Sequence, residues 1–505
     1  MNCCVRLLSN ALTLQKSCSC TGIIGLKKRA PPYRGIIRNY TATQLGTIFA
    51  HSSGFGKCGV AVIRVSGEKT KQAMSAITKK KKLPNAKRVF VSRLWHPKSN
   101  TMLDRAVVFW FAAPSSFTGE DMCEFQVHGG PAVIASVLDA LSSIEGLRPA
   151  EAGDFTKRAF LNDKLDLTEV EGLGDLIHAE TEGQRRQAVH QMEGSLSSLY
   201  QTWTKQILKS MAHCEAFIDF GEDQHLGDQV LTNVVTEVKD VQLKIETHLQ
   251  DSHRGERLRN GVRVCIAGLP NVGKSTLLNL ITQRQAAIVS PIAGTTRDVI
   301  ETALDIDGFP VLMSDTAGLR QSEDIIEKEG VSRAFKKIKE ADLIVFLLCA
   351  DSLKSSSKDV GQLIEKQAKE LGLLKDFNGK QLLYVVNKID LNMDTAQENS
   401  DNTFYVSCKN MDGMSSFLKH FSTCVKDLCG AASIGSIPSI TQQRHRKHLA
   451  DCAQFLQQAI DNFDLDIVIA AEYMRMALHE LGKISGKVDA EQILDVIFQD
   501  FCIGK

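Results

Sequence analysis

The first pattern along the chain is an alternation of short apolar runs and polar turns between about residues 41 and 145. Apolar runs bounded by turn residues are typical of β-strands that bury one face. One segment, 131–141, instead has the spacing of a helix. The apolar runs lie at 59–65, 88–91 and 106–111. We predict a small α+β domain over residues 41–155.

A second pattern, helical spacing with few prolines, covers residues 156–260 and returns after residue 431. The clearest amphipathic segments lie at 169–178, 195–217, 444–461 and 465–481. Each half alone would leave an apolar helix face exposed, whereas pairing the halves buries it. We therefore predict one discontinuous helical domain made of residues 156–260 and 431–505.

The third pattern lies between these halves, where buried strands alternate with helices over residues 261–430. This order is typical of an α/β domain with a mostly parallel sheet. The predicted strands lie at 262–267, 311–313, 385–387 and 403–406. The expected fold class is therefore multidomain α/β and α+β, with an α/β domain inserted into the helical one.

A glycine-rich sequence joins the first predicted strand of the inserted domain to its first helix: Gly268-Leu269-Pro270-Asn271-Val272-Gly273-Lys274-Ser275-Thr276. It fits G-x-x-x-x-G-K-[ST], a loop whose backbone N–H groups surround phosphate at a helix N-terminus. In this motif Lys274 reaches the β- and γ-phosphates, and the Ser275 hydroxyl is a ligand of Mg²⁺. A glycine turn without a ligand is the alternative, but the flanking strand and helix favour the phosphate loop.

Three later motifs complete the nucleotide site, and two of them indicate which base is bound. Asn387-Lys388-Ile389-Asp390 follows an apolar strand, and the Asp390 carboxylate can accept the two N–H donors of guanine, which adenine does not match. Ser407-Cys408-Lys409 fits the loop behind the base, with Cys408 in place of Ala. Asp315-Thr316-Ala317-Gly318 fits the D-x-x-G turn that contacts Mg²⁺ and the γ-phosphate. Their order predicts a Ras-like P-loop GTPase domain.

The charge is unevenly distributed, although the formal net charge is only +1. Residues 1–40 contain seven Lys or Arg and no acidic residue, so the remainder carries about −6 (+1 minus +7). Such a start predicts a mitochondrial transit peptide over residues 1–40, the alternative being a disordered basic tail. An apolar content of 43% without a run of 18 apolar residues predicts no membrane span.

Cysteine usage and charge exclude two further classes of site. The 14 cysteines form no C-x-x-C pair, which indicates a reducing compartment and no zinc site. A mildly acidic mature protein argues against strong non-specific RNA binding, so nucleic-acid contact would need a local basic patch or a partner protein. The four lysines 79–82 are interpreted as a solvated loop rather than an RNA contact.

Two other stretches remain open from the residues alone. Residues 116–124 form a polar turn with an acidic cluster and 127–130 a glycine turn, for which a solvated loop is the favoured interpretation. The apolar C-terminus, 501–505, should fray or dock. Within it Cys502 is either a buried small residue or a reactive thiolate.

Beyond residue 41 nearly the whole chain resembles the tRNA wobble-uridine modification GTPases, the bacterial MnmE/TrmE type and its mitochondrial counterpart. Apart from the GTPase motifs, the resemblance rests on Ile63-Arg64-Val65-Ser66-Gly67, Ser116-Phe117-Thr118-Gly119-Glu120-Asp121, Arg158-Ala159-Phe160-Leu161-Asn162-Asp163-Lys164-Leu165-Asp166-Leu167 and Cys502-Ile503-Gly504-Lys505. It implies a homodimer formed through N-terminal domains that bind 5-formyl- or methylenetetrahydrofolate. It also implies an FAD-dependent partner protein, with which the chain would modify carbon 5 of the wobble uridine of mitochondrial tRNA in the matrix, typically to the taurinomethyl form in animals.

The resemblance carries over to individual residues of the folate site. Arg64, Glu124, Lys164 and Lys505 match folate contacts of the family, and Cys502 matches a cysteine needed for modification. Arg and Lys suit the glutamate carboxylates of folate, and Glu124 suits its donor-rich pterin edge. The family's P-G-R-G-G loop is replaced by Ser-Gly-Phe-Gly-Lys-Cys-Gly at 53–59, which puts the folate contacts of this loop in doubt.

Hydrolysis of GTP needs a group that orients the attacking water, and Ras-like enzymes use a Gln directly after D-x-x-G. Here Leu319 stands in that position and cannot do so. By resemblance, Glu327 is the catalytic residue that orients the water. The alternative is a surface helix residue, because Glu327 has acidic neighbours.

By the same resemblance a potassium ion takes the place of an arginine finger. Its ligands would be the Asn271 side chain and the carbonyls of Ser290, Ile292 and Thr295. A cation against the phosphates stabilises the charge that develops there. Thr296 would be the second Mg²⁺ ligand.

Two other functions stay open. A GTPase switch in ribosome assembly would share the GTPase motifs but would need neither Cys502 nor a folate site. A folate-dependent one-carbon transferase with a vestigial GTPase domain is the other, against which the intact Lys274, Ser275 and Asp390 speak.

Overall fold

The computed structural model describes much of the chain from residue 46 onward. The described residues are 46–54, 56–82, 84–86, 88–220, 228–284, 286–287, 301–315, 336–355, 360–370, 380–391, 402–431, 434, 438–488, 497–498, 501 and 504. The segment predicted as a transit peptide, 1–40, lies outside them. No helix in the described part of the chain is both long and apolar enough to cross a membrane.

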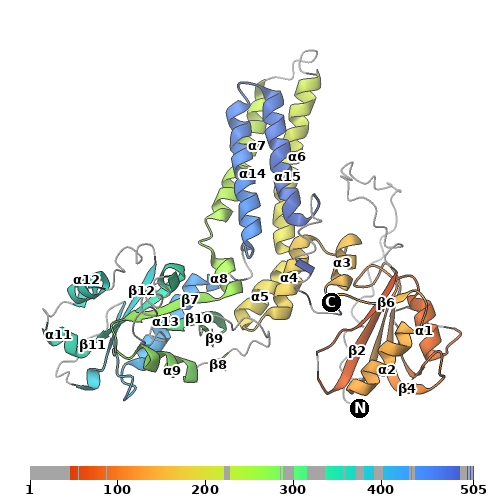
Figure 1. The fold of residues 1–505 in the computed structure, drawn as a ribbon. Helices are drawn as coiled ribbons and strands as arrows, with labels where there is room; N and C mark the ends of the chain where they lie inside the picture. The colour runs from red at the N-terminus through yellow and green to blue at the C-terminus, as the bar shows by residue number, and fades with distance from the viewer. Residues whose placement is uncertain are drawn as a thin grey trace, which may run out of the picture. The chain divides into compact units, whose positions relative to one another are not determined.

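The N-terminal part is a six-stranded sheet with two helices (Figure 1). Its elements are β1 Thr47–His51, β2 Cys58–Ser66, α1 Thr70–Thr78, β3 Val89–Trp95, β4 Met102–Phe111, β5 Met122–Gly129, α2 Pro131–Ser142 and β6 Leu147–Pro149. The strand order is β3-β4-β5-β2-β1-β6, antiparallel except that β6 is parallel to β1. Both helices share one hydrophobic core with the strands, and side chains of alternate strand residues lie on the opposite face.

Strand β5 corrects one interpretation made from the sequence. Residues 122–124 and 127–129 were expected within solvated turns, but residues 122–129 form one strand paired with β2 and β4 in the middle of the sheet. Phe125 and Val127 are buried there, alternating with the polar Glu124 and Gln126. A strand with one face buried shows this two-residue period, which the nearby glycines concealed.

Helices make up the next part of the chain and return near its end. They are α3 Asp154–Leu161, α4 Leu167–His178, α5 Glu182–Met192, α6 Ser195–Phe220, α7 Asp228–Leu249, α8 Arg254–Asn260, α14 Gln443–Asn462 and α15 Ile467–Ser485. Helices α6, α7, α14 and α15 lie side by side in Figure 1 and bury a single hydrophobic core. The two helical segments therefore cover each other's apolar faces, although more than 190 residues separate α7 from α14 in the chain.

The segment between α8 and α14 contains a seven-stranded sheet. Its elements are β7 Val262–Gly268, α9 Lys274–Arg284, β8 Ala286–Ala287, β9 Glu301–Ile306, β10 Phe309–Asp315, β11 Leu343–Cys349, α11 Ala350–Ser355, α12 Val360–Glu370, β12 Gln381–Asn387, the 3₁₀ turn η3 Ile389–Leu391, β13 Thr403–Tyr405 and α13 Met414–Leu428. The order is β13-β12-β11-β7-β10-β9-β8, parallel from β13 to β10, with β9 and β8 antiparallel at the edge.

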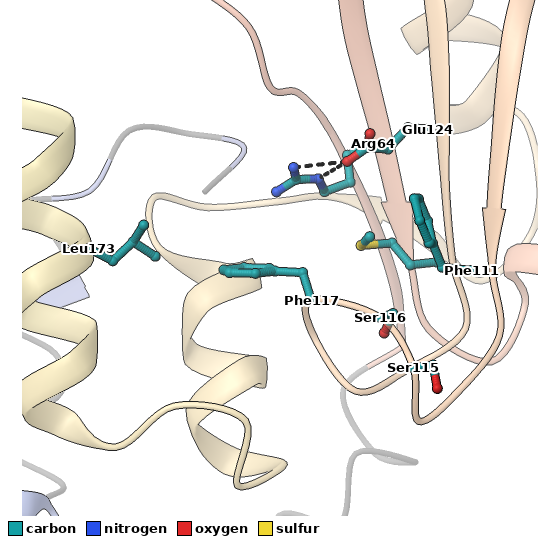
Figure 2. A pocket seen from close by; sticks show the side chains of 8 residues that line it. Arg64, Phe111, Ser115, Ser116, Phe117, Glu124 and Leu173 are labelled. Carbon is teal, nitrogen blue, oxygen red and sulfur yellow. Dashed lines mark hydrogen bonds and ion pairs between the residues drawn. The ribbon is translucent and has the colours of Figure 1, made fainter. Parts of the chain in front are cut away.

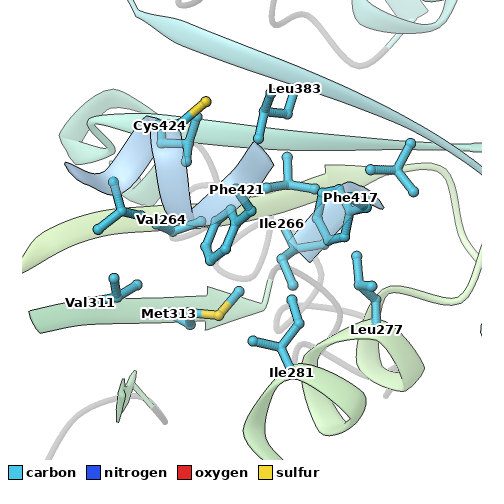
Figure 3. Close-up of a cluster of buried hydrophobic side chains, with 14 of the residues drawn as sticks. Val264, Ile266, Leu277, Ile281, Val311, Met313, Leu383, Phe417, Phe421 and Cys424 are labelled. Carbon is cyan, nitrogen blue, oxygen red and sulfur yellow. The ribbon is translucent and has the colours of Figure 1, made fainter. Parts of the chain in front are cut away.

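The core of this sheet places the glycine-rich loop. Figure 3 shows Val264 and Ile266 of β7 packed with Leu277 of α9 and Phe417 and Phe421 of α13. These side chains are fully buried. Strand β7 and helix α9 are thus fixed on either side of residues 269–273, at the carboxyl end of a central strand, where α/β proteins bind their ligands.

Candidate functional site

The loop between β7 and α9 has the backbone of a phosphate-binding turn. Gly268 and Gly273 have φ values of +146° and +103°, and Asn271 lies in the left-handed region at 60°. A Cβ on Gly268 would lie 2.4 Å from the Leu347 carbonyl oxygen of β11, so only glycine fits this close approach. The loop then enters α9 directly, which aims the helix N-terminus at its interior.

Lys274 is buried within this turn. Its Nζ donates hydrogen bonds to the carbonyl oxygens of Gly268, at 2.9 Å, and Leu269, at 2.8 Å. Ser275 and Thr276 follow in the first turn of α9 and are exposed. An ammonium group, a hydroxyl group and a helix N-terminus therefore converge on one loop, which is the chemistry that a polyphosphate and its Mg²⁺ require.

The loops after β12 and β13 are joined to the phosphate loop through Asn387. Its Nδ2 donates to the Val272 carbonyl at 2.8 Å, and its Oδ1 accepts from the Cys408 backbone N–H at 3.1 Å. Lys388, with φ 66°, donates from Nζ to the Asn271 carbonyl at 2.8 Å. Three segments far apart in the sequence thus form a single hydrogen-bonded unit.

Asp390 is held in place by Ser407. The Ser407 hydroxyl donates to Asp390 Oδ1 at 2.7 Å and accepts from the Asn410 backbone N–H at 3.1 Å. Burial, with a further contribution from Asp390, raises the pKa of the Cys408 thiol to about 11. Cys408 therefore stays neutral and packs as a small apolar residue, which suits a position where alanine is usual. Lys409 is exposed beside it.

Several predicted groups of the GTPase site lie outside the described residues: Ser290, Ile292, Thr295, Thr296, Thr316, Ala317, Gly318, Leu319 and Glu327. Asp315 is the last residue of β10, whose backbone is parallel to β7 and pairs Asp315 with Ile266. The described part of the site therefore brings together the phosphate loop and the two base-side loops. The assignments of potassium and catalytic residues stay predictions.

A separate hollow of about 350 Å³ lies on the sheet of the N-terminal part (Figure 2). Its wall contains an ion pair between neighbouring strands, because Arg64 of β2 and Glu124 of β5 are directly opposite in register. Arg64 Nε and Nη2 both reach Glu124 Oε1 at 2.9 Å. The other residues lining the hollow are Phe111, Ser115, Ser116, Phe117, Met122 and Leu173.

The aromatic walls were not identified from the sequence. The Arg64 guanidinium carbon lies 5.6 Å from the ring centroids of both Phe117 and Phe155. The sequence signal that could have identified these walls is an aromatic residue within a polar turn, such as Phe117 between Ser116 and Thr118. A charged pair between aromatic rings suits a flat heterocycle with polar edges and an anionic substituent.

The loop that carries Phe117 is anchored by a buried ion pair that sequence reasoning also missed. Arg158 of α3 is 2% exposed, and its Nη1 lies 2.8 Å from Glu120 Oε2. The same carboxylate oxygen accepts from the Ser66 hydroxyl at 2.8 Å, and Arg158 Nη2 donates to the Gly46 carbonyl at 2.9 Å. An arginine among the apolar residues of 155–161 was the available signal. Because a buried charge without its partner is costly, this pair holds the loop against the sheet.

The C-terminal residues that the structure describes are docked. Phe501 is buried with Phe498 against α4, and Gly504, with φ 97°, fits where a Cβ would lie 2.4 Å from the His51 carbonyl oxygen. Arg64 Nη1 donates to the Gly504 carbonyl at 3.3 Å. Cys502 and Lys505 are the neighbours of these residues in sequence and lie outside the described residues.

Lys164 is exposed on the turn between α3 and α4. A Cβ on Gly119 would lie 3.4 Å from Lys164 Cε, and Asn162 Nδ2 donates to the Thr118 carbonyl at 2.7 Å. The Lys164 turn therefore contacts the same loop that carries Phe117. Arg64 contacts both Glu124 and Gly504 directly, whereas Lys164 lies beside Gly119 of the loop.

Comparison with known proteins shows which family this chain resembles. Residues 47–164 match the family model described as "GTP-binding protein TrmE N-terminus", and residues 167–502 match "MnmE helical domain". The chain is 50% identical over 470 residues to the 5-taurinomethyluridine-[tRNA] synthase subunit GTPB3, mitochondrial, of Danio rerio, covering 91% of this chain and 93% of that protein. It is 46% identical over 463 residues to the human protein of the same name, with the same coverage.

A bacterial relative shows the same extent of similarity. The tRNA modification GTPase MnmE of Rickettsia bellii is 42% identical over 464 residues, which cover 91% of this chain and all of that protein. The similarity thus spans both sheets and both helical segments rather than the phosphate loop alone. The chain belongs to the MnmE/TrmE family of tRNA modification GTPases.

Proposed function

We propose that this protein hydrolyses GTP and, with an FAD-dependent partner protein, modifies carbon 5 of the wobble uridine of mitochondrial tRNAs with a tetrahydrofolate one-carbon unit, giving a taurinomethyl-type product. The observation that carries the proposal is the meeting of Arg64, Glu124 and Gly504. It places Gly504, two residues after Cys502 in the sequence, at the wall of a hollow that suits a folate. A GTPase switch without modification chemistry would have no need of that arrangement.

For the nucleotide, Asp390 is the residue that selects guanine and Lys274 the one that contacts its phosphates. Ser407 orients the Asp390 carboxylate, and Asn387 fixes the distance between the base-side loops and the phosphate loop. The residues also suit the metal ions: the exposed Ser275 hydroxyl would hold Mg²⁺ with Thr296, and Asn271, exposed on its turn, would offer a side-chain oxygen to K⁺. Such cations stabilise negative charge on the phosphates.

For the folate, the hollow beside Arg64 supplies the matching groups. Glu124 would accept from the amino and N–H groups of the pterin, and the Arg64 guanidinium holds that carboxylate in place. Phe111 and Phe117 supply apolar surface for the ring system. Lys164 and Lys505 would bind the glutamate carboxylates.

The proposed organisation assigns residues 1–40 to a mitochondrial transit peptide and the mature protein to the mitochondrial matrix. Residues 41–155 form the folate-binding domain, 156–260 and 431–505 the helical domain, and 261–430 the GTPase domain. We assign homodimer formation to the N-terminal domain.

The test is the wobble-base composition of mitochondrial tRNA from cells that lack this protein. The modified nucleoside should be absent, should return with the wild-type gene and should stay absent with Cys502→Ser. Binding of 5-formyltetrahydrofolate to the purified protein should disappear with Glu124→Ala, whereas GTP turnover should persist. Normal wobble bases in the deficient cells, with a defect in ribosome assembly, would favour the GTPase-switch function instead.

A further inference from the structure

The edge strand β3 of the N-terminal sheet is surrounded by basic side chains. Residues 79–105 contain nine Lys or Arg and a single acidic residue, Asp104, in a chain that is close to neutral overall. We call the described members the basic edge; they are Lys79, Lys80, Lys81, Lys82, Arg88, Arg93, Lys98 and Arg105. The density and single sign of this charge set the basic edge apart from the mixed surface expected of a mildly acidic protein.

Its centre is a pair of arginines on adjacent strands. Arg93 of β3 and Arg105 of β4 are directly opposite in the antiparallel register, and both are exposed. Like charges in this position repel each other and destabilise the sheet. Among the described residues no ion pair compensates either guanidinium. Asp104, the nearest acid in sequence, already accepts hydrogen bonds from the backbone N–H groups of Arg105 and His128, at 2.7 and 2.8 Å, and pairs with the His128 ring at 2.8 Å.

Two lysines of the basic edge are held in place by aromatic residues of β3. Lys79 Nζ lies 4.0 Å from the centroid of the Trp95 ring and also donates to Asn100 Oδ1. Lys80 Nζ lies 4.2 Å from the centroid of the Phe90 ring. A cation–π contact restricts a long side chain, so these ammonium groups lose less conformational entropy when they bind an anion. The basic edge is therefore partly preorganised rather than a freely moving loop.

We propose that the basic edge binds the sugar–phosphate backbone of tRNA. Guanidinium and ammonium groups are the usual partners of phosphate, and Arg93 with Arg105 presents two adjacent planar donor groups to a chain of regularly spaced anions. A phosphate group between the two guanidiniums reduces their mutual repulsion. Binding of the anion therefore removes an unfavourable electrostatic interaction that the free sheet contains. The choice of tRNA as the occupant rests on the proposed function. The contact is sequence-independent and positions the RNA, leaving the wobble base to other groups.

The test measures the affinity of the full-length protein for a mitochondrial tRNA transcript as a function of salt concentration. The variant Arg93→Gln with Arg105→Gln should bind about tenfold more weakly near 0.1 M salt, because two phosphate contacts are lost. The slope of log K against log salt should fall by about 1.4–1.8, from about 0.7–0.9 for each phosphate. The matched control is Lys205→Gln with Lys239→Gln, which removes two exposed cations from α6 and α7. The control should bind as the wild type does.

The arginine variant also carries a folding control, since removal of like-charge repulsion should leave its melting temperature unchanged or higher. The proposal is overturned if the wild type does not bind the transcript, if the slope is unchanged, or if the control weakens binding equally. It is also overturned if anionic phospholipid vesicles, and not tRNA, depend on Arg93 and Arg105. GTP turnover and folate binding should be normal in the variant. A wild-type protein that neither hydrolyses GTP nor binds folate would contradict the proposed function, but it would not bear on the basic edge.

Discussion

Asn387 Nδ2 donates a hydrogen bond of 2.8 Å to the Val272 carbonyl, joining residues 115 positions apart. The same side chain accepts from the Cys408 backbone N–H, so one amide connects the phosphate loop to both loops on the base side. A Cβ on Gly273 would lie 2.3 Å from this Nδ2, so glycine is needed where the loops meet. The distance between the phosphate site and the base site is therefore set by the side chain of Asn387.

Replacement of Asn387 by Ala should weaken GTP and GDP binding together. The change leaves the Val272 carbonyl and the Cys408 N–H without partners in a buried position, at a cost of about 1–3 kcal/mol for each group. Because both nucleotides contact the same loops, their Kd values should rise in parallel, by about tenfold or more. Titration with fluorescent GTP and GDP analogues measures both. Asn410→Ala, an exposed change in the next loop, should leave both affinities unchanged.

Replacement of Asp390 by Asn should remove the preference for guanine. In Asn an N–H₂ donor replaces the second carboxylate oxygen and faces one of the two guanine N–H donors, which is left without an acceptor, so GTP affinity should fall about 100-fold. Xanthine carries an oxygen where guanine has its amino group, so the amide N–H₂ of Asn can donate to it, and XTP should bind better to the variant than GTP. A competition assay with GTP, XTP and ATP decides this. An unchanged order of affinities would contradict the assignment of Asp390.

Asn271 allows a clean test of the potassium assignment. Its φ of 60° is strained for most residues but not for glycine, so Asn271→Gly removes the side-chain oxygen without disturbing the turn. The wild type should hydrolyse GTP faster in KCl than in NaCl, and the variant should lose this difference, because the amide oxygen is one of the proposed ligands. GTP affinity, which depends on Lys274 and the backbone, should change little. Equal rates of the wild type in both salts would remove the potassium assignment.

The sequence predicted strands β7, β10, β12 and β13 of the α/β part, because each lies next to a motif with a fixed place in the fold. Strands β8, β9 and β11 were not predicted, because no such motif follows them. The strand β5 was missed because it ends at Gly129, with Gly130 next, and because Glu120, Asp121 and Glu124 precede or interrupt its apolar residues. Its position becomes evident only when the partner strands β2 and β4 are known. The Arg64–Glu124 pair was predicted as two folate contacts, but not as a contact between them, because strand register is not visible in one sequence.

Docking of the C-terminus can be tested at Gly504. Ala at this position would have an unfavourable φ of 97° and a Cβ 2.4 Å from the His51 carbonyl oxygen, so the terminal segment should leave its place beside Arg64. Affinity for 5-formyltetrahydrofolate should fall about tenfold or more, equivalent to about 1.4 kcal/mol, with GTP turnover unchanged. Equilibrium dialysis with the folate measures the loss. Gly130→Ala is the control, since Gly130 has φ −81° and the nearest atom to an added Cβ is 4.0 Å away.

His248 should make the helical bundle sensitive to mild acid. Burial lowers its pKa from 6.5 to about 4, with Arg446 and His445 adding to the effect and Asp251 opposing it. Because the folded pKa is the lower one, the stabilising contribution is complete above pH 6.5 and is lost as the pH falls from 6.5 towards 4, by about 2 kcal/mol at pH 5. His248→Phe, which keeps a ring beside Tyr200 and Trp203, should lose less stability than the wild type between pH 7 and 5 in urea unfolding followed by helix circular dichroism. His213→Gln, at an exposed position of α6, should behave as the wild type.

The pKa of Glu171 is lowered to about 2, so protonation of this group reduces the stability of the bundle only below about pH 4.5. It therefore does not affect the difference in stability measured between pH 7 and 5.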